Sequence, residues 1–239
     1  MKLSIIIPVY NEEKTISEVV REVNDVVIPE VKKEIIIVND CSTDNTESVL
    51  NKIKQASKDL IIINHEKNKG KGAAVRTGFS HATGDYVIIQ DADLEYNPQD
   101  FKKLIKPIVK GEAQVVYGTR LKKMPDLSGH GTMSKTRFLL HFFGNRFLSL
   151  ITSILYLQWI TDMETCYKIF PRKFLKKVTL NGEGFNFEPE ITAKLVKSGY
   201  KIVELPITTK PRGYNEGKKL QTFPEGFSAL WTLLKYRFV

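Results

Sequence analysis

Residues 3–9, Leu-Ser-Ile-Ile-Ile-Pro-Val, decide the fold that this sequence predicts. Apolar side chains follow one another almost without interruption, which is typical of a strand buried on both faces of a sheet. Four similar runs follow in the first half of the chain, at residues 34–38, 60–63, 86–89 and 114–117. Stretches of helical period separate them, at residues 12–27, 43–58, 71–82 and 98–110. This alternation predicts an α/β fold, a Rossmann-like and mainly parallel sheet flanked by helices.

The half after Thr119 departs from this rhythm. We expect a loop at residues 121–134, a long helix at 134–159, strands at 166–170 and 201–207, and an amphipathic helix at 223–238. Glu188 and Glu190 are expected in the first turn of a further helix, where acidic side chains favour the helix dipole. No repeat or linker interrupts the chain, so we predict one domain over residues 1–239, with C-terminal amphipathic helices.

Composition excludes several classes of protein. The 239 residues are 42% hydrophobic and 26% charged, as in ordinary globular domains. Two cysteines make no disulfide framework and four scattered histidines have no zinc spacing, so we expect a protein of the reducing cytoplasm. The longest uncharged stretch, residues 147–161, is shorter than the roughly 20 residues that span a bilayer. We therefore expect no transmembrane segment, although the protein can lie on a membrane.

Charge divides the chain in two. The formal net charge is −2 for residues 1–118 and +11 for residues 119–239. A basic second half indicates an anionic partner: nucleic acid, a membrane surface or a phosphate-bearing substrate. Charge alone does not choose among them.

Parallel sheets of this kind bind ligands at the carboxyl ends of their strands. Residues 8–12, Pro-Val-Tyr-Asn-Glu, follow the first strand and contain an aromatic ring and a carboxylate suited to a base or ribose. Asp40 follows the second strand and has the same potential. The alternatives are a helix N-terminus at Glu12 and helix capping next to Asp40. No GxGxxG or Walker A spacing is present, which disfavours dinucleotide binding and a P-loop.

Residues 90–95, Gln-Asp-Ala-Asp-Leu-Glu, follow the fourth strand and form the sharpest signal in the chain. In an extended chain, residues two apart share a face, so Asp91, Asp93 and Glu95 are expected to converge. Carboxylates gathered in this way repel one another unless a cation lies between them. An all-oxygen donor set indicates Mg²⁺ or Mn²⁺, which commonly bridge to substrate phosphates. The alternative is a solvated acidic turn.

Basic and acidic side chains of the second half complete the candidate site. Arg120 follows the fifth strand, and residues 209–219 contain Lys210, Arg212, Lys218 and Lys219. Such side chains suit phosphate oxygens, although a solvated basic loop is the common alternative. Asp162 follows the long uncharged stretch, where a carboxylate is exposed, capping or functional. Cys166 is expected to be a small buried side chain.

In this order the segments resemble family 2 glycosyltransferases with a GT-A fold, and more narrowly the dolichyl- and polyprenyl-phosphate hexose synthases. The resemblance rests on Pro8 to Glu12, Asp40, residues 68–72 with Arg76, Asp91-Ala-Asp93, Gly118 to Arg120, residues 161–168, Pro206-Ile207 and residues 212–218. It implies a nucleotide-sugar half at residues 1–119 and an acceptor half at 120–239. The resemblance covers nearly the whole chain.

The resemblance also implies roles for individual residues. It places the nucleotide sugar at Pro8, Tyr10, Glu12, Asp40, Lys71 and Asp91. It places the metal at Asp91, Asp93 and Glu95, and phosphate contacts at Arg120, Arg212 and Lys218. Independently of the resemblance, Arg137 in the basic beginning of the long helix is expected to contact the acceptor phosphate. Asp93, Arg120 and Asp162 would act in catalysis, with Asp162 orienting the acceptor, or serving as a base if the acceptor were a hydroxyl.

The implied activity is an inverting, metal-dependent transfer of mannose or glucose, from GDP-mannose or UDP-glucose, to a polyprenyl or dolichyl phosphate. A phosphate monoester is already a strong anion at neutral pH and needs little help from a base. We expect a cytoplasmic protein, peripheral on the cytoplasmic face of the membrane. The helix at 134–159 either lies at the bilayer interface or packs as a buried helix. The alternatives are a transferase with a sugar-hydroxyl acceptor and a membrane- or nucleic-acid-binding protein. Nucleic acid would leave the acidic residues unexplained.

Overall fold

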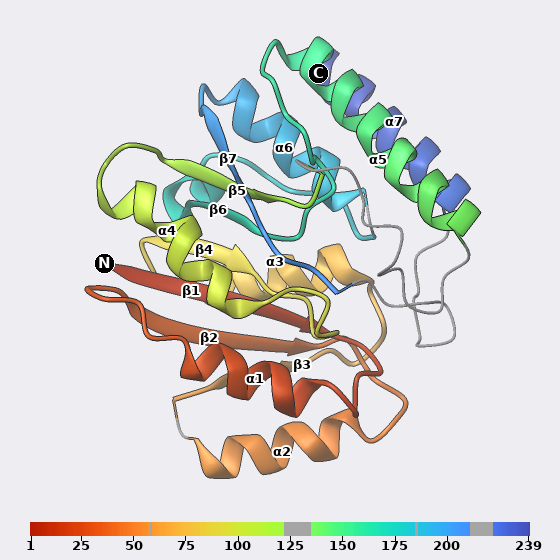
Figure 1. Cartoon of the computed structure of the whole chain (residues 1–239). Helices are drawn as coiled ribbons and strands as arrows, with labels where there is room; N and C mark the ends of the chain where they lie inside the picture. The colour runs from red at the N-terminus through yellow and green to blue at the C-terminus, as the bar shows by residue number, and fades with distance from the viewer. Residues whose placement is uncertain (58, 122–134, 185, 211–221) are drawn as a thin grey trace.

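The computed structural model of the chain describes residues 1–57, 59–121, 135–184, 186–210 and 222–239. These residues build a seven-stranded sheet in the order β3-β2-β1-β4-β6-β5-β7 (Figure 1). Its strands are β1 (Lys2–Val9), β2 (Lys32–Asn39), β3 (Ile61–Asn64), β4 (Tyr86–Ile89), β5 (Val115–Thr119), β6 (Lys168–Pro171) and β7 (Ile202–Pro206). All neighbouring pairs are parallel except those of β6, which is antiparallel to β4 and to β5. The sheet is mainly parallel, as predicted.

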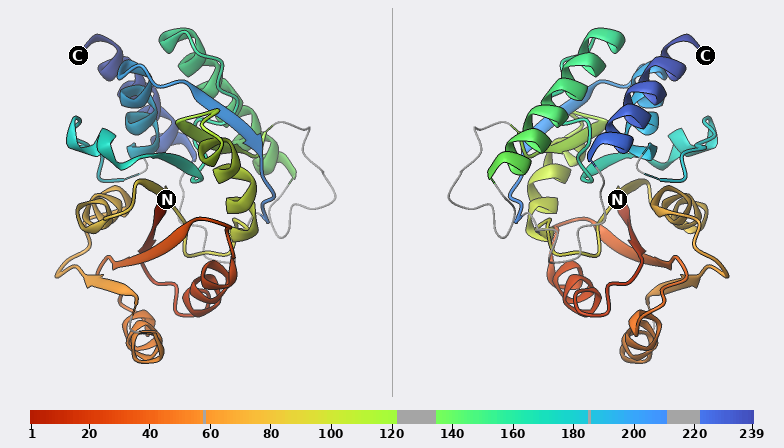
Figure 2. Two further views of the ribbon diagram at one scale, coloured as in Figure 1. Left: turned by 90° about the vertical axis from the view of Figure 1, so that its left-hand side faces the viewer. Right: turned by 90° about the vertical axis from the view of Figure 1, so that its right-hand side faces the viewer.

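Helices cover both faces of this sheet. They are α1 (Ile16–Asp25), α2 (Thr46–Ala56), α3 (Lys71–His81), α4 (Phe101–Val109), α5 (Lys135–Tyr156), α6 (Phe187–Lys197) and α7 (Thr222–Phe238), with short 3-10 helices η1 (Pro98–Asp100) and η2 (Arg172–Lys176). α1 and α4 lie on one face, and α3 and α6 lie on the other (Figure 2). α5 and α7 pack side by side on the outside of the second half (Figures 1 and 2).

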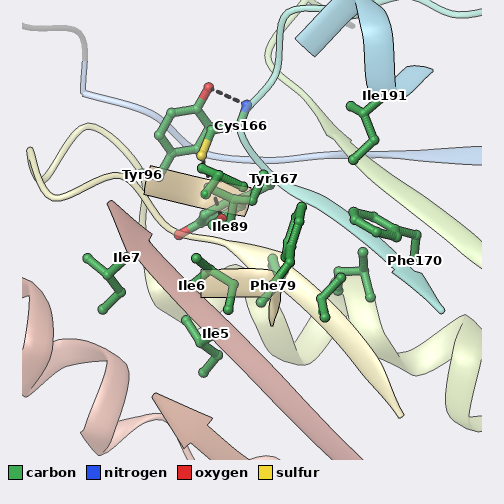
Figure 3. Close-up of a cluster of buried hydrophobic side chains, with 14 of the residues drawn as sticks. Ile5, Ile6, Ile7, Phe79, Ile89, Tyr96, Cys166, Tyr167, Phe170 and Ile191 are labelled. Carbon is green, nitrogen blue, oxygen red and sulfur yellow. Dashed lines mark hydrogen bonds between the residues drawn. The ribbon is translucent and has the colours of Figure 1, made fainter. Parts of the chain in front are cut away.

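Strand β1 runs through the middle of the core. Ile5, Ile6 and Ile7 are all completely buried, because helices and strands surround them on every side (Figure 3). Behind β1, Phe79 of α3 meets Phe170 of β6 edge to face, with ring centroids 5.6 Å apart. Burial on both faces explains why the run at residues 3–9 lacks alternating polar residues.

The predicted elements all appear where the chain is described, with their ends shifted by a few residues. α1 begins at Ile16, so Glu12 and Glu13 precede it and do not lie in its first turn. Glu188 and Glu190 do lie in the first turn of α6, as expected. The loop predicted at 121–134 falls, apart from Leu121, outside the described residues. Within the described chain, no helix combines the length and the hydropathy needed to cross a membrane.

The N-terminus of α3 joins the first half of the chain to the second. The backbone N–H of Gly72 donates to the carbonyl oxygen of Glu183 at 2.7 Å. Arg76, one turn later, donates to the carbonyl oxygen of Gly182. A side chain at Gly72 would collide with this segment, so glycine is needed there for the close approach. The backbone N–H groups of residues 72 and 73 therefore bond to the carbonyl oxygen of Glu183 and hold the start of α3 against the second half of the chain.

Gly72→Ala tests this close contact between α3 and residues 182–183. The new Cβ would stand 2.3 Å from the carbonyl oxygen of Gly182, so the backbone on one side would have to move. Although alanine is the better helix former, we expect the free energy of unfolding to fall by about 1–3 kcal/mol, as is usual for overpacking. Urea denaturation followed by circular dichroism measures the change.

Gly144→Ala in α5 is the matched control, since a Cβ at Gly144 meets no described atom within 4 Å. Its expected effect is between zero and a gain of about 1 kcal/mol from helix propensity. If Gly72→Ala were as stable as the unchanged protein, the close approach would impose no constraint.

Candidate functional site

A cavity of about 460 Å³ opens at the carboxyl ends of β1, β2 and β4 and is closed on its far side by residues of the second half. This is the edge of the sheet at which α/β folds bind ligands. The sequence-predicted residues that line it are Pro8, Tyr10, Glu12, Asp40, Lys71, Asp91, Asp93, Glu95 and Arg120. Residues from four strand ends, far apart in the sequence, therefore meet in one place.

The remaining predicted residues lie elsewhere. Asp162 is completely buried and is not among the described residues that line the cavity. Arg137 belongs to α5, but its side chain is outside the described part of the structure. Arg212 and Lys218 also lie outside the described residues, so their predicted phosphate contacts stay predictions.

Left-handed backbone conformations mark the strand ends around the cavity. Asn11, Cys41 and Leu94 have φ angles of 51°, 58° and 60° and follow β1, β2 and β4. Residues other than glycine adopt this conformation at a cost of roughly 1–3 kcal/mol, and such residues cluster at functional sites. These turns lead the chain from three strand ends past the residues that line the cavity.

Asp40 organises the loop beside the predicted nucleoside position. Its carboxylate accepts hydrogen bonds from the backbone N–H groups of Lys69 (2.9 Å) and Gly70 (2.8 Å). The ring of His65 lies 2.7 Å from the same carboxylate. Gly70 itself has a φ of 86° and leads directly into α3. Asp40 therefore shapes the cavity wall as well as lining it.

The acidic segment reaches the cavity by a turn instead of an extended strand, so the route that we predicted was wrong. Residues 92–94 bend, Leu94 has a positive φ, and the Glu95 N–H donates to the Asp93 carboxylate at 3.1 Å. Strand alternation does not apply across such a turn. The carboxylates of Asp91, Asp93 and Glu95 nevertheless line the same cavity.

These carboxylates would hold a hard divalent cation only together with other ligands, such as substrate phosphates and water. Among the described residues, no three acidic, histidine or cysteine side chains come together as a metal cluster. Mg²⁺ usually takes one or two protein carboxylates and completes its shell with water and substrate phosphates. Oxygen donors on the wall of an open cavity are the arrangement that this mode of binding requires.

A chain of opposite charges runs behind the acidic turn. Lys71 lies 2.6 Å from Asp91 and 3.9 Å from Glu188 of α6. Glu188 in turn pairs with Lys168 of β6, whose side chain is completely buried. Lys71, predicted to bind the nucleotide sugar, thus also ties the acidic turn to the second half.

Arg120 is held at the cavity wall by Asp162. Two nitrogens of its guanidinium donate to the two carboxylate oxygens at 2.8 Å each, and its backbone N–H adds a third bond at 2.8 Å. Burial alone would lower the pKa of Arg120, but the adjacent Asp162 carboxylate more than offsets this and raises it. Asp162 therefore orients a permanently charged donor that faces the cavity.

Several lining residues have no counterpart in the predicted site. Those with polar or reactive side chains are Asn68, Tyr96, Asn145 of α5, Glu164, Cys166 and Glu188. Glu164 lies two residues after Asp162 in the turn before β6, and no pattern in the sequence distinguishes the two carboxylates. Cys166 is buried, as predicted, and its backbone N–H donates to the Tyr96 hydroxyl at 3.1 Å (Figure 3).

Known proteins resemble the chain in sequence. A UDP-N-acetylglucosamine–dolichyl-phosphate N-acetylglucosaminyltransferase from Methanococcus voltae is 30% identical, over 96% of this chain and 94% of that protein. Glycosyltransferase AglJ from Haloferax volcanii is 27% identical, over 93% of this chain and 67% of that protein.

The fold has solved counterparts too. Glucosyl-3-phosphoglycerate synthase from Mycobacterium tuberculosis, solved with Mn²⁺, UDP and glucosyl-3-phosphoglycerate, matches 100% of this chain and 80% of its own with a TM-score of 0.70. At 20% identity this likeness establishes the fold, which is that of the GT-A glycosyltransferases. The family model for glycosyl transferase family 2 matches residues 4–179, nearly three quarters of the chain. The chain is a member of glycosyl transferase family 2.

Proposed function

We propose that this glycosyltransferase moves a sugar from a nucleoside-diphosphate sugar to the phosphate of a polyprenyl or dolichyl phosphate, with inversion at the anomeric carbon. The observation that carries the proposal is the cavity wall, where donor-side carboxylates and Arg120 face Asn145 of a helix with an apolar outer surface. The Methanococcus voltae relative, named for a dolichyl-phosphate acceptor, supports the same class of acceptor. The name of this relative makes N-acetylglucosamine a third candidate for the transferred sugar, beside the predicted glucose and mannose.

In this reaction an acceptor phosphate oxygen bonds to the anomeric carbon as the bond from that carbon to the diphosphate oxygen breaks. The nucleoside diphosphate leaves with the electron pair. Mg²⁺ or Mn²⁺ at Asp91 and Asp93 would offset part of the charge that develops on the leaving group. Arg120, held rigidly by Asp162, adds a fixed donor, so catalysis depends on positioning and on charge neutralisation.

Helix α5 buries polar as well as apolar side chains and exposes several large apolar ones. Ser149, Thr152 and Ser153 face inward, where Ser149 accepts a hydrogen bond from the Met163 N–H at 3.0 Å. Phe147 and Ile154 face outward with 59% and 64% of their surface exposed. The sequence left open whether this helix is interfacial or buried. One face of it packs against the protein, and the described residues leave its other, apolar face exposed.

α7 extends this apolar surface. Trp231 and Phe238 are 69% and 82% exposed, and α7 packs against α5 (Figure 2). The neighbouring Lys235 and Arg237 are exposed and suit anionic lipid headgroups. We define the exposed large apolar residues of both helices as the apolar face: Leu140, Phe143, Phe147, Leu150, Ile154, Phe227, Trp231, Leu234 and Phe238. We propose that it rests on the membrane that holds the acceptor.

The acceptor and donor are tested together by product analysis. The protein is incubated with a membrane lipid extract and, separately, with radiolabelled UDP-glucose, GDP-mannose or UDP-N-acetylglucosamine. We expect label in the organic phase from one of these donors. Label that enters only water-soluble glycans would contradict the lipid acceptor and favour a sugar-hydroxyl acceptor.

Asp93→Asn tests the acidic turn. Loss of one carboxylate charge beside the diphosphate should lower transfer at saturating Mn²⁺ at least about 100-fold, a typical effect of removing one electrostatic contact to the transition state. Folding should be unchanged in thermal unfolding. Asp59→Asn is the matched control, because Asp59 is exposed and precedes the amino end of β3, whereas the cavity lies at the carboxyl ends of the strands. Wild-type turnover of Asp93→Asn would refute the assignment.

The apolar face is tested by sedimentation with anionic liposomes at low salt. Phe147→Glu combined with Trp231→Glu should weaken association at least about tenfold, since each large side chain contributes roughly 1.5–3 kcal/mol when buried. Val27→Glu is the control, because Val27 is 73% exposed but follows α1, far from the face. If the double variant changed the oligomeric state and left liposome binding intact, the face would be a subunit contact instead.

A further inference from the structure

Glu164 is a carboxyl group at the cavity wall with an unused hydrogen-bonding atom. It lies in the turn that precedes β6, and the bond from the Cys166 N–H to Tyr96 holds that turn against the acidic segment. Its Oε1 is buried and has no hydrogen-bond partner among the described residues. A buried polar atom left unpaired costs roughly 1–3 kcal/mol, so such an atom beside a cavity calls for a partner, which a bound ligand or a water can supply.

The charged groups around Glu164 that the structure describes leave it without an ion-pair partner among them. They are Lys168 of β6, Glu188 of α6, Arg120 after β5 and Asp162 in the same loop. Lys168 is paired with Glu188, and Arg120 is paired with Asp162. Burial is the main reason that the pKa of Glu164 rises to about 7. At neutral pH a large fraction of this carboxyl therefore carries a proton that it can donate.

The order of the sheet indicates which part of a ligand reaches Glu164. Tyr10 and Asp40, at the ends of β1 and β2, line the cavity on one side of β4, and Asp93 follows β4 itself. Glu164 precedes β6, the neighbour of β4 on the opposite side. With the nucleoside over β1 and β2 and the diphosphate at β4, the next group along the ligand is the sugar.

We infer that the protonated carboxyl group of Glu164 binds a hydroxyl group of the transferred sugar and donates a hydrogen bond to it. A protonated carboxyl and a hydroxyl can each donate and accept, so they satisfy one another without adding charge beside the diphosphate. An ionised carboxylate there would repel the anionic ligand. The inference rests on the proposed binding of a nucleotide sugar.

Binding measurements separate the sugar contact from the rest of the ligand. Isothermal titration calorimetry with Mn²⁺ compares UDP-glucose, UDP-N-acetylglucosamine and GDP-mannose with UDP and GDP. Glu164→Ala should lower the affinity for the nucleotide sugar that the protein binds about tenfold, which is the effect of one lost hydrogen bond. The same substitution should change the affinity for the matching nucleoside diphosphate by less than about twofold. Glu112→Ala, an exposed glutamate in the turn after α4, is the control.

Glu164→Gln provides a test that does not depend on how well the alanine variant folds. The amide can donate and accept but cannot ionise, so it should bind the nucleotide sugar nearly as well as the unchanged protein at pH 6. Between pH 6 and 8.5 the unchanged protein should lose affinity several-fold relative to Glu164→Gln. Comparing the two proteins with the same ligand cancels the ligand's own ionisation.

Two results would overturn the inference. One is a Glu164→Ala variant that binds the nucleotide sugar as tightly as the unchanged protein does. The other is a Glu164→Gln variant with the same pH dependence as the unchanged protein. If the unchanged protein bound none of the nucleotide sugars, the proposed function would fail first, and that outcome is distinct from both.

Discussion

The ion pair between Lys71 and Asp91 is the contact on which the site depends. Lys71 begins α3, Asp91 follows β4, and their side chains meet 2.6 Å apart at the cavity wall. Through Glu188 the same lysine connects to Lys168, so four charges of alternating sign link the two halves of the chain. Lys168 and Glu188 are both buried, so removing either would leave the other uncompensated, at a cost of about 3–5 kcal/mol. The cavity therefore lies at a boundary that neither half can form alone.

Much of the fold follows from hydrophobic patterning, because β1, β2 and β4 are buried on both faces and show it as continuous apolar runs. Strand ends gather at one edge of a parallel sheet, which is why residues as distant as Tyr10 and Arg120 could be assigned to one site. The turn at 92–94 was not predictable from strand alternation, since it depends on a left-handed Leu94. The ion pair of Lys71 was not predictable either, because it depends on how α3 packs against 182–184.

Asp162 and Glu164 show how environment separates two similar side chains. Both carboxylate oxygens of Asp162 accept hydrogen bonds from Arg120, and Asp162 acts by orienting that arginine. Glu164 lies two residues later without such a partner among the described residues, and burial raises its pKa to about 7. One carboxyl group serves to position a cation, and the other is left available to a ligand. The spacing of residues in the sequence does not predict this difference. The difference arises from the groups that the two halves of the chain place around each carboxyl group.

Helix α5 connects the cavity to the apolar face by a single element. Asn145 lines the cavity, while Phe143 and Phe147, two residues away on either side, are more than half exposed. A helix is only about 10 Å across with its side chains, so the cavity lies roughly one helix diameter from the surface that we place on the membrane. A phosphate at the level of the lipid headgroups can then enter the cavity while its hydrocarbon chain stays in the bilayer. Ser149 and Ser153 of α5 accept hydrogen bonds from the backbone N–H groups of Met163 and Ile160, which holds this side of the helix inward and leaves Phe143 and Phe147 on the outer side.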